Sequence, residues 1–360
     1  MRRRLTVLLG LLVVLGLAAA PGSAAGFGTI DAGGQSREHE RLTRAALSCA
    51  GAAADPDCFQ PVTMDQLAGH DREFGAVGAP DRDELSDPAA HCDDADYLAG
   101  VYPHTRGQAT AALVDCLNHV RMRFGEGLDS ARGLLGPDGE VQPAEVDLTR
   151  GCRSREQRED RAKCATLDAF GRALHGVQDF YAHSNWADEP DPARPIGDEN
   201  PPGLGLPAPS PLLDLRGAAA PDPPAELSTG CFVARDEVPG VGECQLRVTH
   251  AALNKDRGQI DPVTGAATDP TTPRGRVGDN FAKAVAGAVT ETRREWRDLR
   301  SELVARYGTD RGGRMICALT HDDPVNDCAE GNLAAAVAVV AGLAVVALGA
   351  VLWLRRRRRG

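Results

Sequence analysis

The chain has 360 residues, 42% of them hydrophobic, and its 51 acidic residues outnumber its 40 basic ones to give a formal net charge of −11. This acidic excess argues against a surface that binds nucleic acid or anionic lipid head groups in bulk, because like charges repel. No nucleic-acid partner is therefore expected. The length suits one large folded domain or two smaller ones.

The two ends of the chain have the patterns of export and membrane anchoring. Residues 1–25 begin with three arginines, continue through an apolar run and end in small residues, which predicts a secretory signal peptide. Residues 333–354 carry no charge and are followed by five arginines. Such a run can cross a hydrocarbon core of about 30 Å, and flanking positive charge stays in the cytoplasm. The sequence predicts a single-pass cell-membrane protein with an extracellular body (26–321), a stalk (322–332), a transmembrane helix (333–354) and a cytoplasmic tail (355–360); a buried core helix is the alternative for the span.

Four segments of the body have the composition and apolar periodicity of helices, namely 37–54, 106–133, 160–186 and 277–307. Strand signals are weak, with few alternating β-branched runs and only 4% aromatic residues. Between the helices lie long loops, and prolines interrupt regular structure throughout 189–226. The predicted fold class is all-α: a multi-helix body with long loops and disulfides, plus one C-terminal transmembrane helix.

Ten cysteines lie in the predicted extracellular part of the chain, body and stalk together, where disulfides are the default state of an even set. Pairing between neighbours is the preferred interpretation, although spacing alone leaves other connectivities open. A cysteine-rich metal site is the alternative, but the chain contains no C-x-x-C. The neighbouring couples are Cys49 with Cys58, Cys92 with Cys116, Cys152 with Cys164, Cys231 with Cys244 and Cys317 with Cys328.

The stretch ALHGVQDFYAHSNWAD, residues 173–188, carries ligand-type residues at helical spacing. His175, Asp179 and His183 are separated by four residues each, so their side chains stack along one face of a helix with a drift of about 40° per step. Imidazole and carboxylate are ligands of first-row metals and suit zinc. The alternative is an ordinary packed helix on which Asp179 pairs with a histidine.

One helix cannot enclose a metal ion, so other segments must supply ligands. REHERLTRAAL offers His39, and GAVGAPDRDELSDPAAHCDD offers His91 together with an acidic ligand from Asp81, Asp83 or Asp87. RVTHAALNKD offers His250, with either Asn254 or Asp256 as its partner. The predicted metal ligands are His39, His91, His175, Asp179, His183 and His250, together with one of Asp81, Asp83 and Asp87.

These motifs, in this order, resemble those of a known superfamily. LHGVQDFYAHSNW, with the upstream H-E-R-L-T and H-C-D-D and the downstream H-A-A-L-N-K-D, is similar to the Het-C and CinY-like branch of the zinc-dependent phospholipase C and single-strand nuclease superfamily. The resemblance extends over residues 37 to about 307. It implies an all-α phospholipase C-like body that holds a zinc cluster, with Asp81 as a metal bridge and catalytic base.

Three departures from the superfamily pattern bear on the number of ions. Asp179 and His183 are four residues apart rather than six, the predicted mature chain begins at Gly26 rather than at a tryptophan, and Asn254 replaces an acidic ligand. The resemblance therefore implies two zinc ions in preference to three.

Two functions follow as hypotheses. The first is a surface-anchored zinc-dependent phosphodiesterase that hydrolyses a phospholipid or another phosphate ester. Without its two ends the chain carries 32 basic and 51 acidic residues, a net charge of −19, and metal ions would supply the local positive field that a phosphate needs. The alternative is a non-catalytic envelope protein with a degenerate or purely structural metal site that binds a partner.

Overall fold

The computed structural model describes residues 27–31, 34–51, 55–71, 73–98, 104–152, 161–217, 221–232 and 244–329. The predicted signal peptide, transmembrane segment and basic tail lie outside the described residues. The helices are α1 (Glu38–Leu47), α2 (Pro61–Ala68), α3 (Pro80–Asp83), α4 (Pro88–His91), α5 (Arg106–Ala131), α6 (Pro143–Val146), α7 (Ala162–His183), α8 (His250–Leu253), α9 (Asn280–Tyr307), α10 (Thr309–Thr320) and α11 (Pro324–Asp327), with 3-10 turns η1 (Arg132–Leu134) and η3 (Pro211–Leu213) and strands β1 (Gln259–Ile260) and β2 (Ala267–Thr268).

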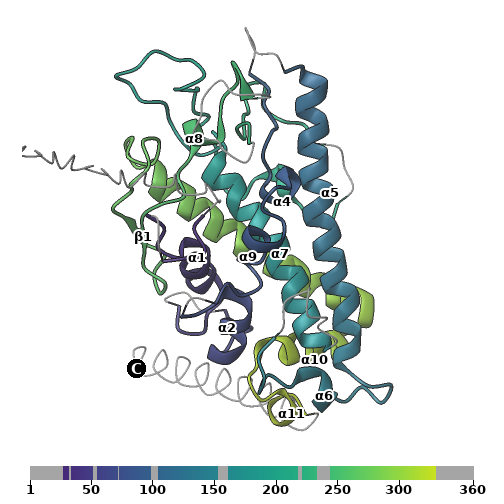
Figure 1. Cartoon of the computed structure of the whole chain (residues 1–360). Coiled ribbons are helices and arrows are strands. Elements are labelled where there is room, and N and C mark those ends of the chain that lie inside the picture. The colour runs from purple at the N-terminus through teal and green to yellow at the C-terminus, as the bar shows by residue number, and fades with distance from the viewer. Residues whose placement is uncertain are drawn as a thin grey trace, which may run out of the picture.

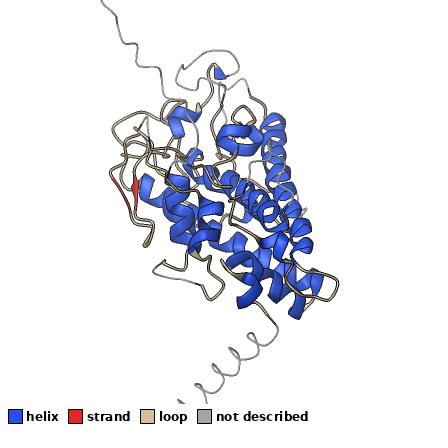
Figure 2. Cartoon of the chain, turned by 60° about the horizontal axis from the view of Figure 1, so that its bottom comes forward, coloured by secondary structure: helices blue, strands red, loops and turns tan. Residues whose placement is uncertain are grey.

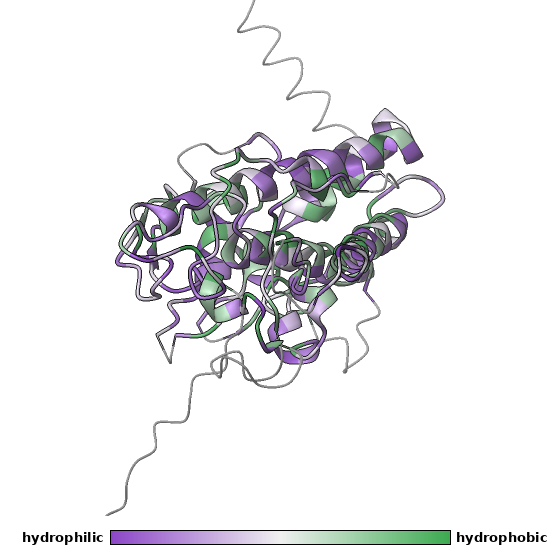
Figure 3. Cartoon of the chain, turned by 90° about the horizontal axis from the view of Figure 1, so that it is seen from above, coloured by the Kyte–Doolittle hydropathy of each residue, from purple (hydrophilic) through white to green (hydrophobic). Residues whose placement is uncertain are grey.

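Helix α7 runs through the middle of the molecule, between α5 and α9 (Figure 1). Of its 22 residues, 20 are buried, so its polar residues lie inside the protein together with its apolar ones. The neighbouring helices carry both hydrophobic and hydrophilic residues along their length (Figure 3). Because α7 is covered on all sides, any polar stripe on it must find its partners within the fold.

Gly171 lets another segment of the chain approach α7 closely. A Cβ built on this glycine would lie 2.5 Å from the Cβ of Ala76 and 2.8 Å from the backbone nitrogen of Val77. Such distances are shorter than real Cβ contacts, so a larger residue would push residues 76 and 77 away from the helix. The close approach matters because the backbone carbonyl of Val77 accepts a hydrogen bond from His175 of α7.

The prediction of an all-α fold is wrong. The protein is about 49% helical and contains a small antiparallel sheet, in which Gln259 of β1 lies opposite Thr268 of β2 (Figure 2). Asp261 accepts hydrogen bonds from the backbone of Val263 and Thr264 and so shapes the turn between the strands. Each strand has only two residues, which is too short to produce a recognisable alternating pattern.

The transmembrane part of the predicted fold class is likewise not supported. In the ranges described above, no helix combines the length and the apolar composition needed to cross a membrane. The longest of these helices, α9, has 28 residues but is interrupted by charges in the stretch TETRREWRDLRSE. Residues 333–354 themselves lie outside the described residues.

All five predicted neighbour disulfides are confirmed, and they close short loops of 9 to 24 residues. Two of them join loops to the long helices, Cys92 to α5 and Cys152 to α7. Residues 322–329, which the sequence assigns to a stalk, contain α11 and the Cys317–Cys328 bond. Asp322 also accepts hydrogen bonds from the backbone of Val62 and Thr63 at the start of α2.

The proline-rich segment 189–226 is irregular in its described parts and is held against the end of α7. The Asn185 side chain donates to the carbonyls of Pro202 and Glu226, and the Trp186 indole donates to the carbonyl of Pro207. Trp186 is also 4% exposed and packs 5.7 Å from the ring of Phe180, as expected of a core residue. The loop is therefore anchored by side chains that directly follow the predicted metal-binding stripe.

Lys163, in the first turn of α7, should make stability depend on pH. Its ammonium group is fully buried and donates to the carbonyl of His321, and burial lowers its pKa to about 7 against the opposing charge of Asp322. Between pH 7 and about 10.5 the unfolded state binds more protons at this side chain, so stability rises with pH in that window. Replacing Lys163→Met should stabilise the protein at pH 6, and the gain should shrink by pH 9.5. Chemical denaturation at both pH values tests this, and an equal difference at both would contradict it.

Candidate metal centre

Three short or medium helices bring ligand-type side chains against the buried stripe of α7. His39 comes from α1, Asp81 from α3 and His91 from α4, and they meet His175 and Asp179. We call these five residues the first group. All five are 9% exposed or less. The structure therefore brings together five of the seven predicted ligands at one place inside the protein.

Two histidines of the first group donate their Nδ1 hydrogens to protein acceptors. His175 Nδ1 lies 2.9 Å from the backbone carbonyl oxygen of Val77, which can only accept. His39 Nδ1 lies 2.7 Å from Gln178 Oε1. The Gln178 amide nitrogen donates in turn to the hydroxyls of Thr43 and Thr292, which leaves its oxygen as the acceptor. Hydrogen bonds of this kind orient metal-binding histidines and select the tautomer with a free Nε2.

The free Nε2 atoms of these two histidines face the carboxylate of Asp179. His39 Nε2 lies 3.1 Å from Oδ1, and His175 Nε2 lies 3.0 Å from Oδ2. A neutral imidazole with its proton on Nδ1 presents only a lone pair there, so each pair repels unless a proton or a metal ion lies between. This arrangement of buried lone pairs fits a bound cation.

His91 and Asp81 complete the first group and lie close to His175. His91 Nδ1 lies 3.0 Å from Asp179 Oδ2 and 2.9 Å from His175 Nε2. Asp81 Oδ1 lies 3.6 Å from His175 Nε2 and has no hydrogen-bond partner within the described chain, whereas its Oδ2 accepts from the Thr29 hydroxyl at 2.5 Å. Burial raises the pKa of Asp179, but its interactions with His175 and His39 outweigh burial and hold that pKa well below its usual range.

A second group lies at the end of α7 and consists of Asp93, His183 and His250. The rings of His183 and His250 have centroids 3.7 Å apart, and His183 Nδ1 lies 3.4 Å from Asp93 Oδ1. Burial, together with the charge of His250, lowers the pKa of His183 well below its usual range, so this imidazole is neutral at neutral pH. Neither ring nitrogen of His183 has a hydrogen-bond partner among the described residues. The three residues offer ligand atoms within 4.8 Å of one another.

Asp93 was missed in the sequence, and the backbone geometry around it is visible only in the structure. It lies in H-C-D-D between Cys92 and Asp94, two non-glycine residues with φ of 58° and 69°. Left-handed backbone at such residues costs free energy and is concentrated at functional sites. The Cys92–Cys116 disulfide holds this turn, so it positions both His91 of the first group and Asp93 of the second.

The other acidic and amide candidates take structural partners. Asp83 accepts a hydrogen bond from Arg172 of α7, and Asp87 caps α4 by accepting from the backbone of Ala89. Asn254 donates to Asp256 at 2.9 Å, so the two candidate partners of His250 bond each other. Within the described chain, none of the four belongs to either group.

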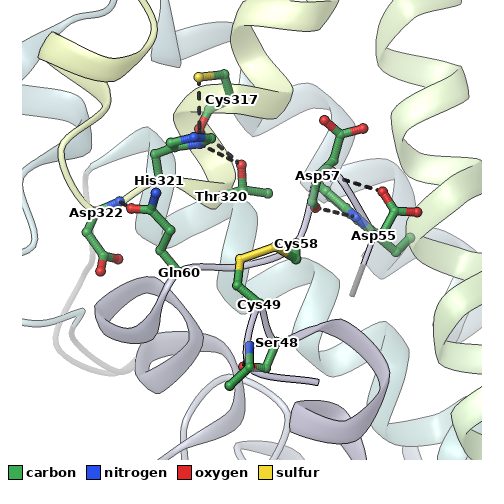
Figure 4. Close-up of a disulfide and its surroundings, with 12 residues drawn as sticks. Ser48, Cys49, Asp55, Asp57, Cys58, Gln60, Cys317, Thr320, His321 and Asp322 are labelled. Carbon is green, nitrogen blue, oxygen red and sulfur yellow. Dashed lines mark hydrogen bonds between the residues drawn. A yellow bond between two sulfur atoms is a disulfide. The ribbon is translucent and has the colours of Figure 1, made fainter. Parts of the chain in front are cut away.

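One more set of ligand-type residues lies at the far end of the molecule and consists of Cys317, His321 and Cys328. Figure 4 shows Cys317 and His321 of this set. Both sulfurs are in a disulfide, so no thiolate is available to a metal. His321 Nδ1 instead lies 3.1 Å from the hydroxyl of Thr320 and 3.6 Å from Cys317 Sγ. In its oxidised form this set is a structural element.

No family model matches the chain, and neither the curated proteins nor the solved structures contain a significant match. The candidate metal centre therefore rests on its own geometry. Several histidine and aspartate groups of the described chain could hold a metal ion.

Gln178 should control metal affinity through His39. Replacing Gln178→Leu removes the acceptor of the His39 Nδ1 hydrogen, and the loss of such an orienting partner costs about 10- to 100-fold in affinity. Gln178→Glu keeps an acceptor at the same place and should retain affinity. Titration with divalent cobalt, whose visible spectrum reports its ligands, measures both variants. Equal affinity in the leucine variant and the wild type would show that Gln178 does not orient a ligand.

Proposed function

We propose that this protein is a zinc-dependent hydrolase of phosphate diesters. The observation that supports it most is the convergence of the His39 and His175 Nε2 lone pairs on the buried carboxylate of Asp179. A buried carboxylate surrounded by imidazole nitrogens that have given their protons elsewhere is a ligand set, and it would be costly without a cation. The five disulfides support a location in an oxidising compartment.

The donor set favours zinc. All eight residues of the two groups offer imidazole nitrogen or carboxylate oxygen, which zinc accepts readily, and no sulfur ligand is present in either group. Each group offers at least three ligand residues, so we propose one ion in each, two in all. Asp93 supplies the second group with the carboxylate that Asn254 does not provide.

Bound divalent ions supply two things in such a site: they lower the pKa of a water and neutralise charge on a phosphoryl group. The side chains of the protein supply the base and hold the ligands in their orientation. Asp81 is the proposed base, because its Oδ1 has no hydrogen-bond partner among the described residues while the Thr29 hydroxyl holds its Oδ2. His39 and His175 are held in one orientation by Gln178 and Val77.

Phosphate diesters are the proposed substrate class for two reasons. Adjacent metal groups are the usual device for in-line displacement at phosphorus. The resemblance to the Het-C and CinY-like branch of the zinc-dependent phospholipase C superfamily supports the same class, and seven of the eight residues of the two groups, all except Asp93, stand at positions that it implies.

A non-catalytic role for the metal is the second candidate, and one observation favours it. No side chain of either group is more than 9% exposed. Structural zinc sites are closed, whereas catalytic ones keep a position open to water or substrate. A measurement of diester hydrolysis distinguishes the hydrolase from the non-catalytic metal site.

Substituting His175 or Asp179 of the first group should remove both bound metal and hydrolytic activity. We expect about two zinc ions per wild-type chain, and loss of at least one in His175→Ala and in Asp179→Ala, because each contributes to the first group. Hydrolysis of bis(p-nitrophenyl) phosphate should fall by about 10³-fold or more in both variants. Elemental analysis and absorbance measure the two quantities on protein purified with its disulfides intact.

His70→Ala is the matched control, since the His70 side chain is 38% exposed and bonds only acidic neighbours outside both groups. It should bind zinc and hydrolyse the diester as the wild type does. Fewer than one zinc per wild-type chain, unchanged in either ligand variant, would refute the metal centre. Full zinc content without hydrolysis would leave the structural role.

A further inference from the structure

Phe232 differs from most phenylalanines of the chain in its surroundings. Six of the eight phenylalanines lie in the hydrophobic core, whereas Phe232 is half-buried and belongs to neither hydrophobic cluster of the described residues. Part of its large apolar ring therefore stays exposed to solvent, where a ligand could cover it.

The ring of Phe232 lies beside both metal-ligand groups. Its centroid is 5.5 Å from that of His250 in the second group and 6.4 Å from that of His91 in the first. Both histidines are 3% exposed or less, so Phe232 is the more exposed neighbour of each. Phe232 thus lies within aromatic contact distance of one histidine of each group.

The backbone next to Phe232 is held firmly with respect to the second group. Cys231 is in a disulfide with Cys244, and its backbone nitrogen donates to the carbonyl of Val248 at 2.7 Å. The backbone nitrogen of His250 donates to the carbonyl of Cys231 at 2.9 Å. The attachment point of the ring is thus placed by the same contacts that place the His250 ligand, which is the preorganisation that a binding site requires.

We propose that Phe232 is a specificity-determining residue that binds an apolar substituent on the phosphorus of the substrate. This inference rests on the proposed phosphate chemistry. A phosphate oxyanion held at the two groups would place its ester substituent near the ring, and burial of the exposed ring face against that substituent favours apolar over small groups. The substituent is an aryl ring or an alkyl chain.

Binding of phosphonates to the zinc-loaded protein tests this without requiring turnover. Calorimetry should show phenylphosphonate and butylphosphonate bound about two- to tenfold more tightly than methylphosphonate, the range expected for one aromatic or aliphatic contact. Phe232→Ser should abolish this preference, whereas Phe232→Tyr, which keeps the ring, should retain it. Preference for phenyl alone or for butyl alone identifies the source of the substituent.

Phe74→Ser is the control, because Phe74 is also half-buried and outside both clusters but its ring faces Arg82. It should keep the wild-type preference. Equal affinities for the three phosphonates in the wild type, no binding of any of them, or an unchanged preference in Phe232→Ser with full zinc content would each overturn the proposal. If the protein hydrolyses diesters but binds the three phosphonates equally, the role of Phe232 is refuted and the proposed function stands. If it prefers the larger phosphonates but hydrolyses no diester, the proposed function is refuted and the role of Phe232 in binding stands.

Discussion

The contact on which the candidate site depends is the meeting of the Asp179 carboxylate with imidazole nitrogens deep inside the protein. Asp179 is fully buried and receives the backbone N–H of Phe27 at 3.1 Å, yet its two oxygens also lie 3.1 Å and 3.0 Å from the Nε2 atoms of His39 and His175. In the neutral tautomer that donates from Nδ1, each of these nitrogens presents a lone pair to the carboxylate. A fold that holds such groups together must gain from a cation that binds there.

The surrounding architecture is arranged to keep these groups in place. Helix α7 is buried along nearly its whole length, and Gly171 lets the chain at Val77 come close enough to accept the His175 hydrogen. The Cys92–Cys116 disulfide holds the turn that carries a ligand of each group. Next to α7, Lys255 donates to the Ser184 carbonyl and to Asp188, which ties the segment after α8 to the end of the ligand helix. Residues of both groups thus lie on the same buried helix, and the contacts around that helix hold it in place.

Part of this site was predictable from the sequence because it depends on local periodicity. Spacing of four residues places His175, Asp179 and His183 on one helix face whatever the rest of the chain does, and neighbouring cysteines favour short disulfide loops. Asp93 and Gln178 could not be assigned in the same way. Their roles depend on contacts with residues far along the chain, such as His250 and His39, and no pattern within either segment encodes those contacts.

The prediction of the fold was limited in the same way, because it depended on local sequence patterns. The four predicted helices correspond to α1, α5, α7 and α9 with ends within a few residues, except that α1 ends at Leu47, where Ser48 is extended and the Cys49–Cys58 loop begins. The 12-residue helix α10 was not predicted. The two-residue strands and the short helices α3, α4 and α8, by contrast, are too brief for periodicity to reveal. These short elements carry Asp81, His91 and His250, so the segments that complete the site are those that local sequence describes least well.

Anomalous diffraction at the zinc edge from crystals of the protein tests the central claim most directly. Two peaks should appear, one beside Asp179 within about 2.0–2.2 Å of the Nε2 atoms of His39 or His175, and one between Asp93, His183 and His250. Absence of both peaks in zinc-soaked crystals, with the imidazoles of His39 and His175 in the same orientation, would contradict the account.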